Sequence, residues 1–247
     1  MQPARHLDID GAYNVRDLGG YGTSDGRRTR WQTLVRADSL HRVPPAYQDA
    51  LIDYGIRTVI DLRTTAETLA EPNVFSASPN VSYLHHDMAG DMEPSDGRED
   101  LEGMARIVAI YTSRLDRRLA QIGETLAAIA APGALPAIYH CAGGQDRTGL
   151  ITALLLGIAG VPEETIAEDY ALTAHYYINL FLGKDAPPDV DPADYTWQAY
   201  QQRSCPPEVM LATLEHLGDR YGGVEGYVRT AGLDSAQVEG LRNAIVE

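Results

Sequence analysis

The sequence predicts an α/β fold in which helices flank a mostly parallel central sheet. Three short apolar segments rich in β-branched or aromatic residues are typical of buried strands, and segments with helical spacing alternate with them along the chain. A short glycine-containing loop, residues 141–147, stands between the third of these strands and an apolar helix. Strand, loop and helix in that order form the phosphate-binding site of many α/β proteins.

The first half of the chain is expected to hold short strands and one helix. Residues 1–40 are rich in Gly, Asp and Arg and are predicted to form short strands joined by turns. Helical spacing fills residues 44–54, where Gly55 ends the helix. The β-branched run at 58–60 predicts a buried strand, and 81–86 predicts another.

The second half opens with an acidic loop at about 88–103, which we expect to be mobile. Residues 135–140 predict the strand that runs into the glycine-containing loop. The segment after that loop is apolar on nearly every side, which is typical of a buried helix. Helices are expected over residues 102–131, 148–160, 207–221 and 234–246, with a further helix starting at 162–164.

Length and composition favour a single globular domain over 1–247. The 247 residues, 44% of them hydrophobic, can bury a sizeable core, and neither a linker nor a repeat divides them. The net charge of −15 disfavours nucleic acid and anionic membranes as partners. Because neither an apolar run of about 18 residues nor a signal-peptide pattern occurs, we expect a cytoplasmic protein without stable membrane association.

The stretch HCAGGQDRTG carries the chemistry of the chain. Backbone N–H groups of this loop and of the following helical turn can hold phosphate oxygens, and the helix dipole favours an anion there. The same donors stabilise a thiolate at Cys141, which can then attack phosphorus. The planar fork of Arg147 can bind two phosphate oxygens, and the hydroxyl of Thr148 can hydrogen-bond the sulfur as it leaves. Gly143 and Gly144 allow a close approach of the backbone.

This stretch resembles the signature loop of cysteine-dependent protein tyrosine phosphatases, in particular the bacterial atypical, PtpB-like group, which typically has HCxxGKDRTG. NVRDLGGYGTSDGRRTRWQTLVRADSL is similar to the family's N-F-R-D-L-G-G block, GIRTVIDLRTTAE to its second block, and RYGGVEGYVRTAGL to its C-terminal helix and turn. The matches follow the family's order and span most of the chain.

The resemblance implies a cysteine-phosphatase fold and a phosphocysteine intermediate formed without a metal or other cofactor. Cys141 would be the nucleophile and Arg147 the phosphate clamp. The phosphate-binding loop would comprise Ala142, Gly143, Gly144, Gln145, Arg147 and Thr148. Family members act on phosphotyrosine, some also on phosphoserine and phosphothreonine, and some on phosphoinositides. The partner would be a phosphorylated protein or a small phosphorylated molecule, and the segment 174–207 would form a lid over the pocket.

The general acid that protonates the leaving group stays open between two aspartates. Asp146 is the first choice, because the aspartate of the family's K-D-R has been assigned this role. Asp87, which follows the strand at 81–86, is the second choice, because it matches the position of the acid loop in other tyrosine phosphatases. Asp61 lies at the exit of a strand, where a structural pair with Arg63 is the simpler interpretation.

Gln145 is the departure from the family pattern, since the family usually has lysine there. A neutral side chain at the pocket rim would weaken phosphoinositide activity. Three hypotheses follow: a phosphatase for phosphotyrosine, with or without phosphoserine and phosphothreonine; a phosphatase for phosphoinositides or small metabolites; and a phosphate-binding module that has lost catalysis.

The remaining candidates have mostly structural interpretations. His140 is expected to hydrogen-bond the backbone and order the loop. Asn14 forms part of a structural turn or positions the phosphate-binding loop. Arg36 and Asp38 are expected to form a pair, and Cys205 is expected to be a bystander. Adjacent His85 and His86 would point to opposite faces of a strand, so no metal site is expected there.

Overall fold

A mixed sheet forms the centre of the molecule, with the strand order β1-β2-β5-β3-β4. The structure, a computed structural model, describes residues 4–90, 101–182 and 196–247. The strands are β1 (Arg16–Asp17), β2 (Leu34–Ala37), β3 (Thr58–Asp61), β4 (Ser82–His85) and β5 (Ala137–His140). Only β1 among these runs antiparallel to its neighbour. The predicted α/β fold with a mostly parallel sheet is confirmed.

The register of the four parallel strands brings their carboxyl ends to one edge of the sheet. His140 at the end of β5 is paired with Ala37 of β2 and with Asp61 of β3, and Asp61 is paired with His85 of β4. The residues that follow these ends therefore gather at one edge. In open α/β sheets this edge is where ligands bind.

Alternation along the strands divides the apolar side chains between two cores. Leu34, Ile60 and Tyr139 belong to the larger core, whereas their neighbours Val35 and Val59 belong to the smaller one. Successive side chains of a strand point to opposite faces, so the two cores lie on the two faces of one sheet. The sheet is thus buried on both sides, as a parallel sheet requires.

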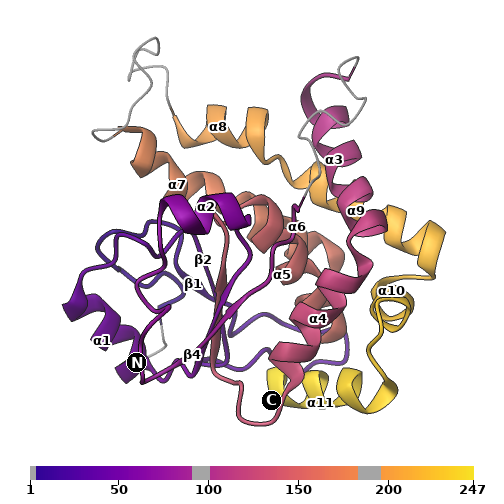
Figure 1. Cartoon of the computed structure of the whole chain (residues 1–247). Coiled ribbons are helices and arrows are strands. Elements are labelled where there is room, and N and C mark those ends of the chain that lie inside the picture. The colour runs from indigo at the N-terminus through magenta and orange to yellow at the C-terminus, as the bar shows by residue number, and fades with distance from the viewer. Residues whose placement is uncertain (1–3, 91–100, 183–195) are drawn as a thin grey trace.

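Helices cover the two faces unequally. On the smaller core lies α1 (Pro45–Tyr54), together with N-terminal segments. The larger core is packed by α3 (Gly103–Arg117), α4 (Leu119–Ala130), α5 (Asp146–Ile158), α6 (Glu163–Ala171), α9 (Pro207–Tyr221), α10 (Val224–Thr230) and α11 (Ser235–Ile245). Figure 1 shows α1 on one side of the sheet and α4, α5 and α11 on the other. The short α2 (Thr65–Ala70), α7 (Thr173–Leu182) and α8 (Trp197–Ser204) lie towards the carboxyl edge.

The helix after the glycine-containing loop is the most buried one, as its sequence predicts. Every residue of α5 from Thr148 to Leu156 is buried. The helix begins at Asp146 rather than at Thr148, so Asp146 and Arg147 occupy its first turn. The helical stretch expected over 102–131 is divided at Arg118 into α3 and α4. The sequence pattern did not predict α2, α7 or α8, whereas α10 lies within the segment RYGGVEGYVRTAGL, for which the resemblance implied a helix and a turn.

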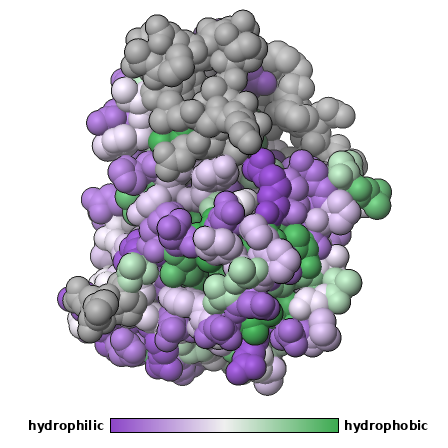
Figure 2. Space-filling view, turned by 90° about the vertical axis from the view of Figure 1, so that its left-hand side faces the viewer, coloured by the Kyte–Doolittle hydropathy of each residue, from purple (hydrophilic) through white to green (hydrophobic). Residues whose placement is uncertain are grey.

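The surface on the side of α1 is a mixture of hydrophilic residues and small hydrophobic patches (Figure 2). Across the described ranges, no helix is both long enough and apolar enough to cross a membrane. Most of the expected acidic loop at 88–103 and the middle of the expected lid at 174–207 lie outside the described residues, so mobility of the loop stays a prediction.

Candidate active site

The loop after β5 lies at the carboxyl edge of the sheet, between the ends of β2 and β3. Its start is fixed on both sides, because Leu62 N donates to the His140 carbonyl at 2.8 Å and Ser39 N donates to the Ala142 carbonyl at 2.9 Å. Cys141 is a free thiol with 2% of its surface exposed. The strand therefore delivers the cysteine to the base of the loop rather than to the open surface.

The backbone N–H groups of residues 142–148 have no hydrogen-bond partner in the described part of the chain. Gly149 is the first residue after them whose N–H donates a backbone hydrogen bond, to the Gln145 carbonyl at 2.8 Å. Unpaired amides that lead into a helix N-terminus form an anion-binding site, because both the N–H dipoles and the helix dipole favour negative charge. The buried thiol of Cys141 directly precedes these donors.

The loop is held against β2 by a glycine that no other residue could replace without strain. Gly144 has a φ of 65°, and a Cβ atom built on it would lie 2.6 Å from the Ala37 carbonyl oxygen. A positive φ and a backbone contact this short together require glycine. At Gly144 this close approach of the backbone is to β2.

Two buried side chains bind the outward carbonyls of the loop. Asn14 Nδ2 donates to the carbonyls of Gly143 and Gly144 at 3.1 and 3.3 Å, and Arg36 Nη2 donates to the Gly144 carbonyl at 2.6 Å. Arg36 is itself paired with Asp169 of α6 at 2.5 Å. Carbonyls that are held outward leave the amides of the same peptides free for a ligand. These contacts agree with positioning of the loop, one of the two roles expected for Asn14.

The expected pair between Arg36 and Asp38 is wrong. Arg36 pairs with Asp169 of α6, whereas Asp38 accepts hydrogen bonds from the backbone N–H groups of Tyr13 and Asn14 at 2.9–3.0 Å. Burial raises the pKa of Asp38 to about 6, although these amides partly offset the effect. The pair was expected because residues two apart on an extended segment share a face. Each of the two side chains instead binds a partner on another segment.

Arg147 forms a two-point ion pair with Glu67 of α2. Its Nη1 and Nη2 atoms donate to the two carboxylate oxygens at 2.6 and 2.9 Å. Burial would lower the pKa of Arg147, but the bonds to Glu67 raise it above its usual value. Within the described residues the Nε–H of Arg147 has no partner. The two Nη atoms of the Arg147 guanidinium are thus held by Glu67, and its Nε–H remains available to an oxyanion.

Glu67 is held in turn by the start of its own helix. Thr64 and Glu67 form a capping box, in which Thr64 Oγ1 accepts from Glu67 N and a Glu67 carboxylate oxygen accepts from Thr64 N at 2.6 Å. Burial would raise the pKa of Glu67, but the hydrogen bonds from Arg147 and from the Thr64 amide lower it to about 2. Glu67 is therefore ionised at any ordinary pH.

Asp146, next to Arg147 in the first turn of α5, faces a cavity of about 450 Å³. The hydroxyl of Tyr111 on α3 donates to its carboxylate and also lies 2.9 Å from the hydroxyl of Tyr170. Thr64, Glu67, Ala89, Gly90, Ile107, Ile110, Tyr111, Arg114, Asp146 and Arg147 line the cavity. A carboxyl group beside the anion-binding loop and open to a cavity can deliver a proton to a leaving group.

Asp87, the second candidate acid, is occupied by backbone donors. Its carboxylate accepts from the N–H groups of Thr65, Ala89 and Gly90 at 2.6–3.0 Å. Burial opposes ionisation, yet these donors hold the pKa of Asp87 below its usual value. A carboxylate stabilised in this way is a poor proton donor, and it is not among the residues that line the cavity.

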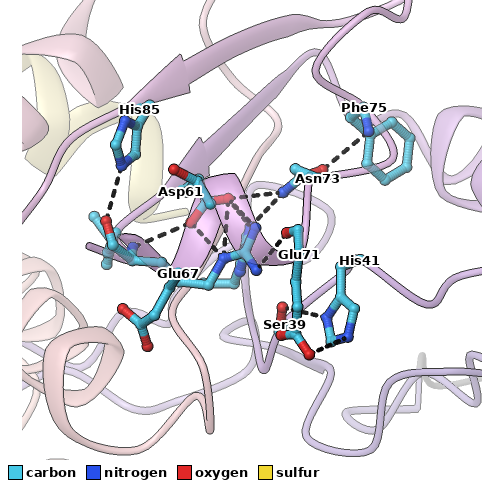
Figure 3. Close-up of polar contacts among 12 residues, drawn as sticks. Ser39, His41, Asp61, Glu67, Glu71, Asn73, Phe75 and His85 are labelled. Atoms are coloured by element: carbon cyan, nitrogen blue, oxygen red, sulfur yellow. Dashed lines mark hydrogen bonds and ion pairs between the residues drawn. The ribbon is translucent and has the colours of Figure 1, made fainter. Parts of the chain in front are cut away.

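Asp61 belongs to a buried polar network, and Figure 3 shows its contact with Asn73. It binds Arg63 through both carboxylate oxygens at 2.8–3.2 Å and accepts from Asn73 Nδ2 at 3.1 Å. Asn73 Nδ2 also donates to His140 Nε2 at 2.7 Å, so the proton of His140 is on Nδ1, which contacts the Cys141 carbonyl at 3.2 Å. Burial lowers the pKa of His140 to about 4, so this histidine is neutral. The predicted structural roles of Asp61, Arg63 and His140 agree with these contacts.

Gln145 does not lie at the rim of the cavity, and that expectation is wrong. The side chain is 9% exposed, donates to the Ser204 carbonyl at 2.9 Å and accepts from the Tyr200 hydroxyl at 3.0 Å. Both partners belong to α8, the described end of the expected lid. Gln145 thus joins the loop to α8.

Several smaller predictions can also be placed. The buried hydroxyl of Thr148 has no partner in the described ranges, so it is available to a ligand or to the sulfur. Burial raises the pKa of Cys205 to about 12, consistent with an unreactive bystander. His85 Nε2 contacts the Arg63 carbonyl and His86 Nδ1 contacts Thr125 Oγ1. Tyr177, in a described part of the expected lid at 174–207, packs over Gly143.

Sequence reasoning missed Glu67, Tyr111, Arg114 and Asp169. The signal for Glu67 was present, because Thr-Thr-Ala-Glu after a strand is a capping-box pattern. The other three lie on predicted helices, but the sequence does not tell which face of a helix meets the loop.

Comparison with known proteins agrees with this arrangement. The tyrosine phosphatase family matches residues 7–247 of the chain. A tyrosine-protein phosphatase of Nostoc commune is 29% identical over 219 residues, which cover 85% of this chain and 72% of the relative. The triple specificity protein phosphatase PtpB of Mycobacterium tuberculosis is 22% identical over 280 residues, which cover 97% of this chain and 98% of the relative. The chain therefore belongs to the tyrosine phosphatase family, as a PtpB-like bacterial member, and is a phosphoric monoester hydrolase of the protein-tyrosine-phosphatase type.

Proposed function

We propose that this protein hydrolyses phosphotyrosine through a phosphocysteine intermediate on Cys141. The observation that carries the proposal is the run of backbone N–H groups at 142–148, which have no partner within the described ranges and directly follow a buried free thiol. Arg147, held by Glu67, adds a fixed positive charge beside these donors. A phosphoryl group bound there would have its equatorial oxygens on the amides and on Arg147, with sulfur in line for attack.

The first step forms the S–P bond and breaks the P–O bond to the leaving group. The tyrosine oxygen departs with the electron pair of that bond and takes a proton from Asp146. The second step uses water, which loses a proton to the ionised Asp146 and attacks phosphorus. The S–P bond then breaks, inorganic phosphate leaves, and the thiolate returns. The free hydroxyl of Thr148 can stabilise the departing sulfur.

Two observations support phosphotyrosine as the substrate. The relative from Nostoc commune is named as a tyrosine-protein phosphatase. Gln145 is neutral and bound to α8, so it does not supply the positive charge that the family's usual lysine brings to this position. The name of the mycobacterial relative, a triple specificity phosphatase, favours phosphoserine and phosphothreonine as slower substrates of this protein as well.

The test compares a phosphotyrosine peptide, a phosphoserine peptide, a phosphoinositide and p-nitrophenyl phosphate, in buffer with a chelator and no added metal. We expect hydrolysis of p-nitrophenyl phosphate and the highest kcat/KM for the phosphotyrosine peptide. Cys141→Ser should abolish turnover, and Cys205→Ser is the matched control that should retain it. Phosphopeptide binding by an inactive wild type would instead indicate a binding module. A higher kcat/KM for the phosphoinositide would assign the chain to lipids.

A further inference from the structure

Arg114 of α3 is a half-buried arginine that faces the same cavity as Asp146 and Arg147. It lies on one side of the helix together with Ile107, Ile110 and Tyr111, which all line the cavity. Residues three, four and seven positions apart share a helix face, so this side of α3 forms one wall. The wall is apolar at its beginning and positively charged at its end.

Arg114 has no counter-ion among the described residues. It takes part in none of their ion pairs, and its Nε is buried without a hydrogen-bond partner. Burial lowers the pKa of its guanidinium, and the positive charge of Arg147 acts in the same direction, whereas Asp146, Tyr111 and Cys141 partly offset this effect. An arginine remains charged even so. Arg114 is therefore a partly desolvated positive charge beside a second one.

This arrangement is unfavourable without a ligand. Partial removal of a charge from water without a close partner costs free energy, and two arginines in one cavity repel each other. Arg147 is compensated by Glu67 at 2.6 Å, whereas no carboxylate of the described residues lies within ion-pair distance of Arg114, which Asp146 attracts only from farther away. The phosphate that binds the loop would be engaged by the amides and by Arg147. Arg114 would keep free donors for another anion.

We propose that Arg114 binds a second anionic group, a carboxylate or a phosphate, on the same substrate molecule whose phosphate occupies the loop. The inference rests on the proposed function and names its preferred substrates as doubly anionic ones. The cavity of about 450 Å³ leaves room for more than a phosphate. The apolar side chains of Ile107 and Ile110 can contact the ring that carries the two acidic groups.

The experiment uses phenyl phosphate, 3-carboxyphenyl phosphate and 1,3-phenylene bisphosphate as substrates. The wild type should hydrolyse the two doubly anionic substrates with higher kcat/KM than phenyl phosphate. Arg114→Gln should remove about tenfold or more of that preference, chiefly through KM, because a charge-assisted hydrogen bond contributes about 1.5–3 kcal/mol. Comparison of 3-carboxyphenyl phosphate with 1,3-phenylene bisphosphate shows whether a carboxylate or a phosphate is the preferred second anion.

The matched control is Arg106→Gln, which removes the same charge from an exposed position of the same helix and should keep the preference. Arg114→Lys, which retains the charge, should keep part of it and serves if Arg114→Gln does not fold. An equal loss for all three substrates, or a wild type without a preference, would overturn the inference. Absence of hydrolysis of every substrate by the wild type would overturn the proposed function instead.

Discussion

At the scale of single residues, the state of Arg147 is set by Glu67. The carboxylate binds the Nη1 and Nη2 atoms and leaves the Nε–H available, so the guanidinium is oriented before any phosphate arrives. Because the pKa of Glu67 is lowered to about 2, this orientation does not change across the neutral and mildly acidic range. Preorganisation of this kind lowers the free energy of the transition state without a change in the bound phosphate.

Glu67→Gln should therefore lower kcat/KM by up to about 100-fold, because the fork of Arg147 would lose its two-point anchor. Glu71→Gln is the matched control, since Glu71 lies at the other end of α2 and contacts His41 rather than Arg147. Steady-state kinetics with p-nitrophenyl phosphate measure both variants. If the two variants lose the same activity, the anchor on Arg147 is not what matters.

Asp146 is predicted to act on the leaving group alone. Asp146→Asn should slow hydrolysis of phenyl phosphate, a poor leaving group, by about 100-fold or more, and that of p-nitrophenyl phosphate much less. Tyr111, which donates to the Asp146 carboxylate, should be a positioning residue, so Tyr111→Phe should show the same trend at smaller size. The same loss for both leaving groups in Asp146→Asn would exclude this residue as the acid.

At the scale of elements, the loop depends on segments far away in the sequence. The N-terminal segment supplies Asn14, β2 supplies Arg36, and α6 supplies the Asp169 that pairs with it. All three side chains are buried. The strand and helix on either side of the loop determine where it lies. Asn14 and Arg36 determine the direction of its carbonyl groups.

The carboxyl group of Asp38 links β2 to the N-terminal segment, and its pKa gives a pH signature. Because the folded pKa is about 6 and the usual value is 3.8, the folded protein holds a proton here that the unfolded chain has released. The stabilising contribution is complete below about pH 4 and is lost as the pH rises through about 6. Asp38→Asn, which keeps an oxygen for both amides, should remove this dependence.

Denaturant unfolding at several pH values tests this expectation. Relative to the wild type, Asp38→Asn should gain up to about 3 kcal/mol between pH 4 and pH 7, since one pKa unit corresponds to about 1.4 kcal/mol. Asp49→Asn, on the exposed side of α1, is the control and should show little change. A stability difference that is constant with pH would mean that Asp38 does not titrate in this range.

At the scale of the whole molecule, the sequence predicted what depends on local pattern. The β-branched run at 58–60 and the apolar residues after Arg147 predicted a strand and a buried helix, and the sheet and α5 contain them. Which side chains meet across elements was not predictable, because the face that a helix turns to the loop depends on packing. For that reason Glu67, Tyr111 and Arg114 were missed, and Gln145 was expected at the rim although it contacts α8.

The arrangement of the whole molecule brings a thiol, unpaired amides and two arginines to the carboxyl edge of one sheet. The proposed mechanism depends above all on covalent transfer of the phosphoryl group to Cys141. The most direct measurement is mass spectrometry of the wild type and of Asp146→Asn, quenched in acid during turnover of p-nitrophenyl phosphate. We expect one added phosphoryl group on the peptide that contains Cys141, lost again when the substrate is exhausted. Turnover without this adduct, or an adduct on another residue, would contradict the account.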